Sequence, residues 1–101
     1  MVIVIFRSRI RPDADAAVMA SAGAHMYELA SAMPGFISYK DFVAEDGEYA
    51  SIVEFADAAS LKAWREHPEH RLMQQRGREE FMSEYHIQVC EPIRNYSFKA
   101  D

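Results

Sequence analysis

The sequence is poor in cysteine, glycine and proline, with one, four and four of these residues among its 101. A single thiol, Cys90, cannot form a disulfide within the chain, which fits a reducing compartment. Four widely scattered glycines cannot build a phosphate-binding loop, a dinucleotide-binding fingerprint or a nucleophile elbow. The small numbers of cysteine and glycine therefore exclude a domain stabilised by disulfides and the common nucleotide-binding motifs.

Long apolar runs and an excess of basic charge are also missing. The opening run from Val2 to Phe6 is too short for the core of a signal peptide, and no run approaches the roughly 18 residues of a membrane span. The formal net charge is −5, and nucleic acid phosphates require a basic surface. We therefore expect a cytoplasmic protein that binds neither a membrane nor nucleic acid.

Apolar and aromatic side chains, in contrast, make up 50% of the residues. A chain of this length suits one domain spanning residues 1–101. Such a small domain buries only somewhat over about 60% of the surface that its unfolded chain exposes. The abundance of apolar residues therefore indicates that part of the surface is buried against a partner.

The first third of the chain predicts a strand followed by a helix. Residues 2–11 are rich in β-branched side chains, which favour a strand. Asp13 is the expected N-cap of a helix with Asp15 in its first turn, and apolar residues then recur at steps of three and four as far as Met33. The Pro34-Gly35 pair ends this helix.

The middle of the chain predicts a β-hairpin. Strands are expected over residues 36–44 and 49–56, where apolar and aromatic side chains are frequent. Between them, Asp46 and Gly47 are expected to supply the positive φ angles of a tight turn.

The last part predicts a second, interrupted helix and a final strand. Asp57 is the expected cap, and His67 is the expected cap of a new helical stretch from Pro68 to Met82. A long strand then covers residues 83–98, with Pro92 at an edge or a bulge. The order βαββαβ with right-handed crossovers predicts an α+β, ferredoxin-like fold, with a four-stranded antiparallel sheet and both helices on one face.

The strands are apolar on both faces, although helices cover only one. In the first strand Val2, Val4 and Phe6 point one way, while Ile3 and Ile5 point the other. A second copy, related by two-fold symmetry, would cover the free face, so we expect a homodimer through the sheet, with the long last strand reaching toward the partner. The alternative is a monomer with a few exposed apolar side chains.

A group of residues in the second half is typical of one protein family. The group comprises Ala63-Trp64-Arg65-Glu66-His67-Pro68-Glu69-His70, Gln74, Gly77-Arg78, Phe81, Arg94, Tyr96 and Phe98, together with the Pro34-Gly35-Phe36 step. In these residues the chain resembles the antibiotic biosynthesis monooxygenase family, in particular the short bacterial branch grouped with haem-degrading monooxygenases. The resemblance covers essentially the full chain and implies a dimeric α+β barrel with a pocket between helices and sheet.

Two activities come with this resemblance: oxidation of phenolic or quinol-like compounds by O₂ without a bound cofactor, and opening of the haem ring. The haem branch combines a first-strand asparagine, a tryptophan on the second helix and a later histidine. Trp64 matches the tryptophan, but Phe6, Arg7 and Ser8 stand where the asparagine would fall. His70 also lies closer to Trp64 than the haem-ligating histidine would. We therefore expect no cofactor, with haem as the alternative.

His70 and Trp64 are the candidate catalytic residues. With an ordinary pKa near 6.5, His70 suits the removal of a phenol proton. Trp64 would be an aromatic wall on which a flat substrate stacks. The alternatives are a surface or packing role for His70 and core packing for Trp64.

Five further residues are candidates for lining the pocket. His25 lies beside the apolar stripe of the first helix, next to Met26, and Phe6 lies on the first strand. Tyr39 and Tyr85 could each donate a hydrogen bond to an oxyanion. The alternatives are a solvated helix flank for His25 and core filling for Met26.

Several polar residues have simpler interpretations. His67 and His70 are three apart, but no third ligand follows, so we expect no metal site. Arg7, Arg9 and Arg11 could hold an anionic group, yet cross-strand pairing with carboxylates is the preferred interpretation. The leading hypothesis is a monooxygenase acting on a small aromatic molecule. The alternatives are a non-catalytic dimer that binds a small ligand, and a haem-binding protein with His25, His67 or His70 as the ligand.

Overall fold

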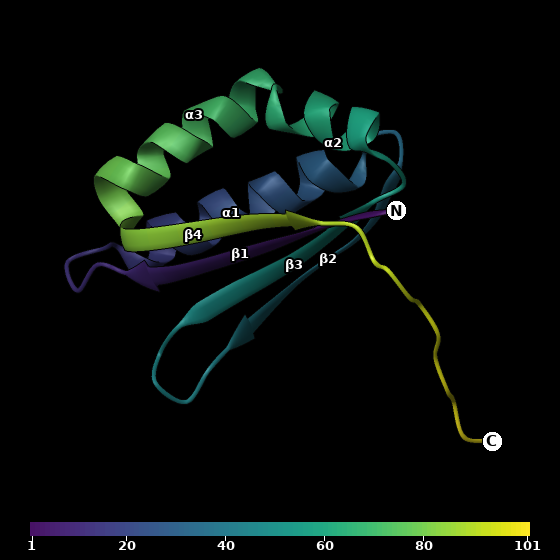
Figure 1. Cartoon of the computed structure of the whole chain (residues 1–101). Helices are drawn as coiled ribbons and strands as arrows, with labels where there is room; N and C mark the ends of the chain where they lie inside the picture. The colour runs from purple at the N-terminus through teal and green to yellow at the C-terminus, as the bar shows by residue number, and fades with distance from the viewer.

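The computed structural model describes all 101 residues as one sheet with helices on one side (Figure 1). The elements in chain order are β1 (Val2–Ile10), α1 (Ala16–Ser31), β2 (Phe36–Val43), β3 (Tyr49–Phe55), α2 (Ala58–Arg65), α3 (Pro68–Arg76), the π-helical turn η1 (Gly77–Phe81) and β4 (Met82–Cys90).

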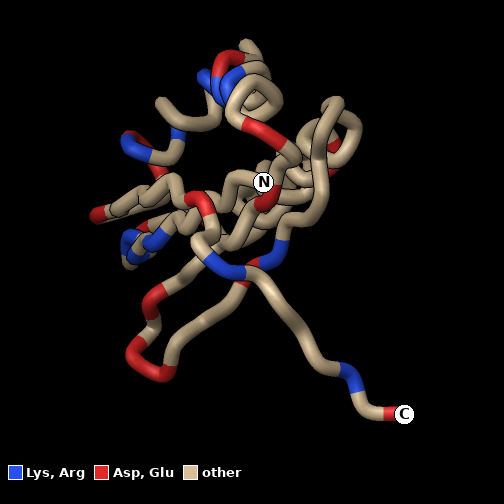
Figure 2. The backbone as a smooth tube through the Cα atoms, turned by 45° about the vertical axis from the view of Figure 1, so that its right-hand side comes forward, with Lys and Arg blue, Asp and Glu red and all other residues tan.

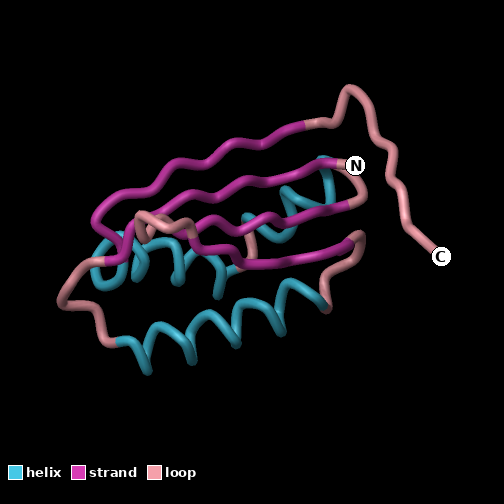
Figure 3. The backbone as a smooth tube through the Cα atoms, turned by 90° about the horizontal axis from the view of Figure 1, so that it is seen from below, coloured by secondary structure: helices cyan, strands magenta, loops and turns pink.

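The four strands form one antiparallel sheet in the order β2-β3-β1-β4. Figure 3, seen from below, shows the strands in front and the helices behind them, so one face of the sheet carries no helix. The α+β, ferredoxin-like βαββαβ arrangement predicted from the sequence is confirmed. No helix is long and apolar enough to span a membrane.

A side-chain cap fixes the start of each of the three α-helices, and one of these caps differs from the prediction. Asp15, not Asp13, caps α1, and its Oδ1 accepts hydrogen bonds from the backbone N–H groups of Ala17 and Val18. A carboxylate satisfies the free amides best when it stands directly before the first turn, and Asp13 is too far upstream. Asp57 and His67 cap α2 and α3 as predicted.

The hairpin between β2 and β3 also differs in detail. Only Gly47 has a positive φ, at 90°, whereas Asp46 does not. The amide of Gly47 donates to the carbonyl of Ala44, and the amide of Ala44 to that of Glu48, which defines a three-residue loop with one left-handed position. Asp46 contributes its side chain instead, accepting a hydrogen bond from the amide of Glu48.

Ion pairs tie this hairpin to β1. Arg7 pairs with Glu48 at 2.8 Å, and Arg9 pairs with Asp46 at 2.9 Å and with Glu84 at 3.3 Å. Figure 2 shows the acidic tip of the hairpin in red. The predicted pairing with nearby carboxylates is therefore confirmed for Arg7 and Arg9, whereas Arg11 donates to the backbone carbonyls of Met82 and Arg78.

The last strand is shorter than predicted. β4 ends at Cys90, which pairs with Ile3 near the start of β1. Beyond that point β1 offers no further partner and Pro92 lacks an N–H to donate, so the ladder stops. Residues 91–101 extend away from the body (Figure 1). Their apolar side chains lie in solvent, and Ile93, Tyr96 and Phe98 are all at least 82% exposed.

The hydrophobic core lies between the sheet and the helices. It consists of Val2, Met26, Ala30, Val53, Phe55, Leu61 and Trp64. Only 11 of the 101 residues are buried, which is a small number for a domain of this size. On the opposite face Ile5 lies directly across from Ile52, and both residues are half-buried.

Candidate functional site

His70 stacks on Trp64 at the junction of α2 and α3. The two ring centroids are 4.2 Å apart and the planes differ by 11°. The proline-initiated start of α3, capped by His67, places His70 in the first turn of that helix and beside the last turn of α2. Two predicted catalytic residues are thus brought into direct contact.

One backbone contact fixes the tautomer of His70. Its Nδ1 lies 3.1 Å from the carbonyl oxygen of Trp64. A carbonyl only accepts hydrogen bonds, so Nδ1 carries the proton in the neutral ring and Nε2 keeps a free lone pair. Burial lowers the pKa of His70 below its ordinary value, against a smaller opposing effect of the Trp64 carbonyl. His70 is therefore a neutral imidazole at pH near 7, which is the protonation state of a general base.

Trp64 and Met26 both belong to the core. Trp64 is 4% exposed and Met26 is 5% exposed, and Tyr39 and Met73 pack against the same cluster. One side of the Trp64 ring stacks on His70 while the rest is packed among apolar side chains. Of the predicted site residues, Trp64 and Met26 thus belong to the hydrophobic core, Tyr39 packs against that core, and His70 stacks on Trp64.

Tyr39 is a phenol that stays protonated. Burial raises its pKa above 10, and the nearby carboxylate of Asp41 adds to the effect. Its ring also packs edge-to-face on Tyr27 of α1, with centroids 5.8 Å apart. A half-buried, protonated phenol is a hydrogen-bond donor for a developing negative charge.

Phe6 and Tyr85 form a second stack, on the helix-facing side of β1 and β4. Their centroids are 5.5 Å apart and their planes differ by 18°. Phe6 shares this side with the buried Val2, because alternate residues of a strand point the same way. Tyr85 is 41% exposed, so the stack ends at the open edge of the sheet.

An open groove with a volume of about 490 Å³ lies between α1 and α3. Its lining residues are Ala17, Val18, Ser21, Ala22, His25, Met73 and Arg76. Among the predicted pocket residues only His25 lines it directly. Met73 connects the two regions, because it lines the groove and also packs against the core cluster that contains Trp64.

His25 closes one end of this groove. Its Nε2 donates to Oε1 of Glu69 at 2.9 Å, and this contact joins α1 to α3. Arg76, which the sequence analysis did not single out, lines the groove near the start of α1. The recurrence of Val18, Ser21, Ala22 and His25 at helical spacing was the sequence signal for this wall, but its partner on α3 depends on how the helices pack.

No group of three or more His, Cys, Asp or Glu side chains is placed to hold a metal ion. Each histidine proposed as a haem ligand has one ring nitrogen engaged: His25 with Glu69, His67 with the amide of Glu69, and His70 with Trp64. Nε2 of His67 and Nε2 of His70 make no hydrogen bond.

Comparison with known proteins gives a family and several structural neighbours. The chain is 27% identical to Rv0793 from Mycobacterium tuberculosis, with a TM-score of 0.82 over 95% of this chain and 98% of that one. It is 16% identical to SnoaB from Streptomyces nogalater, a cofactor-independent oxygenase, with a TM-score of 0.77 over 93% and 94% of the two chains. No curated protein sequence matches the chain.

The model of the antibiotic biosynthesis monooxygenase family matches residues 1–76. That range holds β1 through α3 and thus includes His25, Trp64 and His70. On this match, and on a fold shared over nearly its full length with Rv0793, the chain belongs to the antibiotic biosynthesis monooxygenase family.

Proposed function

We propose that the protein is a monooxygenase that oxidises a small phenolic aromatic compound with O₂ and without a bound cofactor. The observation that carries this proposal is the pairing of a neutral base with an aromatic surface, His70 stacked on Trp64 with Nε2 unbonded. Family membership and the shared fold with the cofactor-independent oxygenase SnoaB support the same chemistry.

The reaction begins with proton transfer. The phenol O–H gives its proton to Nε2 of His70, and the resulting phenolate passes one electron to O₂. The substrate radical and superoxide then form a carbon–oxygen bond at a ring carbon that carries hydrogen. The peroxide takes back the proton from His70, and loss of water leaves a carbonyl. One oxygen atom enters the product, the other leaves as water, and the substrate supplies all four electrons.

The protein's residues hold the substrate and exclude water during this sequence. Trp64, buried in the core, holds the ring of His70 by stacking, and the phenol of Tyr39 donates to the phenolate. Met26, Phe6 and Tyr85 are the further residues that we propose for substrate contact. All lie on the helix-facing side of the sheet, where apolar surroundings strengthen each polar interaction.

A homodimer is part of the proposal. The face of the sheet that carries Ile5 and Ile52 lacks a helical cover, and the segment after Cys90 presents Ile93, Tyr96 and Phe98 to solvent. A second copy placed on this face would bury both groups. We also propose a cytoplasmic location, which suits the unpaired Cys90.

The test is O₂ consumption with a panel of phenols that begins with 1-naphthol. We expect O₂ uptake together with quinone absorbance, and one atom of ¹⁸O₂ in the product. His70→Asn keeps an N–H near the carbonyl of Trp64 but removes the base, so turnover should fall about 100-fold or more. Arg71→Ala, an exposed neighbour on α3, is the matched control and should leave the rate unchanged.

Two outcomes would contradict the proposal. Full turnover in His70→Asn would remove His70 from the reaction. If aromatic compounds bind but no member of the panel gives O₂ uptake, the protein is instead the non-catalytic dimer that binds a small ligand. A Soret band on adding haemin, lost in one of the histidine variants, would instead favour the haem-binding alternative.

A further inference from the structure

The groove between α1 and α3 carries a cation whose hydrogen-bonding edge is free. Arg76 uses Nε to donate to Oε2 of Glu80 at 2.8 Å. Its two terminal nitrogens, Nη1 and Nη2, make no hydrogen bond to the protein. The side chain is 32% exposed and lines the groove. A guanidinium with this edge free is the usual partner of a carboxylate, which it binds through two parallel hydrogen bonds.

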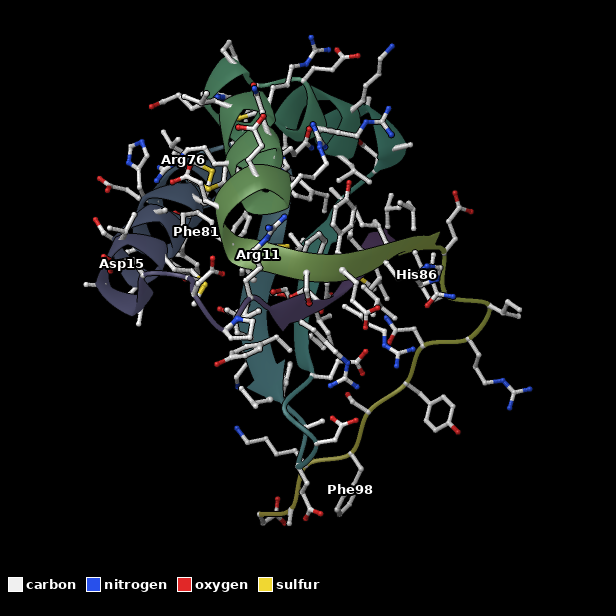
Figure 4. The ribbon with its side chains drawn as sticks, turned by 90° about the vertical axis from the view of Figure 1, so that its left-hand side faces the viewer. Arg11, Asp15, Arg76, Phe81, His86 and Phe98 are labelled. Carbon is white, nitrogen blue, oxygen red and sulfur yellow. The ribbon has the colours of Figure 1, made fainter.

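Two contacts hold the guanidinium in place before any ligand arrives. Its Cζ atom lies 5.2 Å from the centroid of the Phe81 ring, a cation–π contact. The bond to Glu80, one helical turn later, fixes the Nε edge. Figure 4 shows Arg76 and Phe81 at this end of the groove, near Asp15 at the start of α1. A side chain already ordered loses little further freedom when a ligand binds.

The rest of the groove has the composition of an aromatic binding site. Val18, Ala22 and Met73 provide apolar contact, and Ser21 adds one hydroxyl. The volume of about 490 Å³ is in the range of small-molecule sites. At the far end the pair of His25 and Glu69 bridges the two helices and limits the length of the ligand.

We infer that this groove binds the carboxylate of a small aromatic acid, with the carboxylate on Nη1 and Nη2 of Arg76 and the ring against Val18, Ala22 and Met73. Neither His70 nor Trp64 lines this groove, so the bound acid is a second ligand and goes beyond the proposed oxidation of a phenol. The Glu80 carboxylate stays on Nε and leaves the terminal edge for the ligand.

The test is binding without turnover, by calorimetry under nitrogen with 2-naphthoate and its uncharged analogue 2-naphthamide. We expect 2-naphthoate to bind about tenfold or more tightly than 2-naphthamide, because a hydrogen bond to a charged group is worth more than a neutral one. Arg76→Gln should remove this preference, and Arg71→Gln, exposed on the same helix, should keep it. Ser21→Phe, which fills the groove from the exposed side of α1, should abolish binding of both probes.

Nuclear magnetic resonance locates the bound acid. Amide shifts on adding 2-naphthoate should concentrate in residues 17–25 and 73–76. Equal affinity for the two probes, a preference that survives in Arg76→Gln, or no binding at millimolar concentration would each overturn the inference. Because no O₂ is present, these outcomes are independent of 1-naphthol oxidation, so failure of the groove and failure of the oxygenase can be told apart.

Discussion

At the scale of single residues, the stack of His70 on Trp64 links packing to chemistry. The ring of His70 loses solvent when it packs on the indole, and a charged imidazolium suffers more from that loss than a neutral one. The contact that orders the ring therefore also keeps it in the basic, uncharged form. Trp64 therefore acts on the chemistry through His70, because its own ring is buried in the core.

The lowered pKa of His70 predicts a pH dependence of stability. The unfolded chain takes up a proton at this residue near pH 6.5, whereas the folded protein takes it up only at lower pH. The stabilisation by neutral His70 is therefore complete above about pH 6.5 and is lost as the pH falls toward the folded pKa. We expect the free energy of unfolding to decrease between about pH 7.5 and pH 5, measured by urea denaturation.

His70→Asn provides the comparison, since asparagine does not titrate. Its free energy of unfolding should change less over the same pH range than that of the unsubstituted protein. Titration of the His70 ring by nuclear magnetic resonance should give a pKa below 6.5. A ring that titrates at or above that value would disprove the effect of burial.

At the scale of elements, the turn between α1 and β2 depends on one glycine. Gly35 has a φ of 80°, and a Cβ at this position would collide with the side chain of Ser60. The same residue's carbonyl accepts the amide of Ala56, so the turn fixes where β2 starts beside the end of β3.

We expect Gly35→Ala to lower the free energy of unfolding by about 1–3 kcal/mol, because alanine is strained at positive φ and also clashes. Gly23→Ala is the matched control. Gly23 is exposed in the middle of α1 with nothing near its would-be Cβ, so the same substitution should raise stability by about 0.5–1 kcal/mol. Chemical denaturation of both variants measures the difference, and equal effects would contradict the argument.

The sequence was sufficient to predict the elements wherever a local signal marks them. The apolar spacing up to Met33 identified α1, and Asp57 and Pro68 marked the starts of α2 and α3. It was insufficient where a boundary depends on a distant strand. β4 stops at Cys90 because β1 offers no partner beyond Ile3, which no local pattern around residues 91–98 reveals.

The residues of the candidate site also divide into those that a local sequence pattern predicts and those that depend on distant parts of the chain. The stack of His70 on Trp64 was within reach, since both belong to one short helical segment. Arg76 was missed because its importance arises from α1, a segment some 50 residues earlier that packs beside it. Contacts between helices that are distant in sequence are set by packing of the whole fold, for which one sequence carries no direct signal.

At the scale of the whole molecule, the main feature is the small number of buried residues. On the helix-free face of the sheet Ile5 and Ile52 are only half-buried, and Phe42 is exposed. A partner on that face would complete the core in the way that the helices complete it on the other side.

We expect sedimentation equilibrium to give twice the 11.6 kDa of one chain at micromolar concentration. Ile5→Glu, which places a charge opposite Ile52, should shift the mass toward that of the single chain. Leu72→Glu is the control, because Leu72 is 58% exposed on α3, away from the helix-free face. A single-chain mass for the unsubstituted protein would exclude the dimer.

The strand order has a consequence for how the protein is made. β1 lies in the interior of the sheet, between β3 and β4, and β4 is synthesised after every other strand. During translation β1 therefore spends most of the time with one unpaired edge, and its β-branched residues stay available to neighbouring nascent chains.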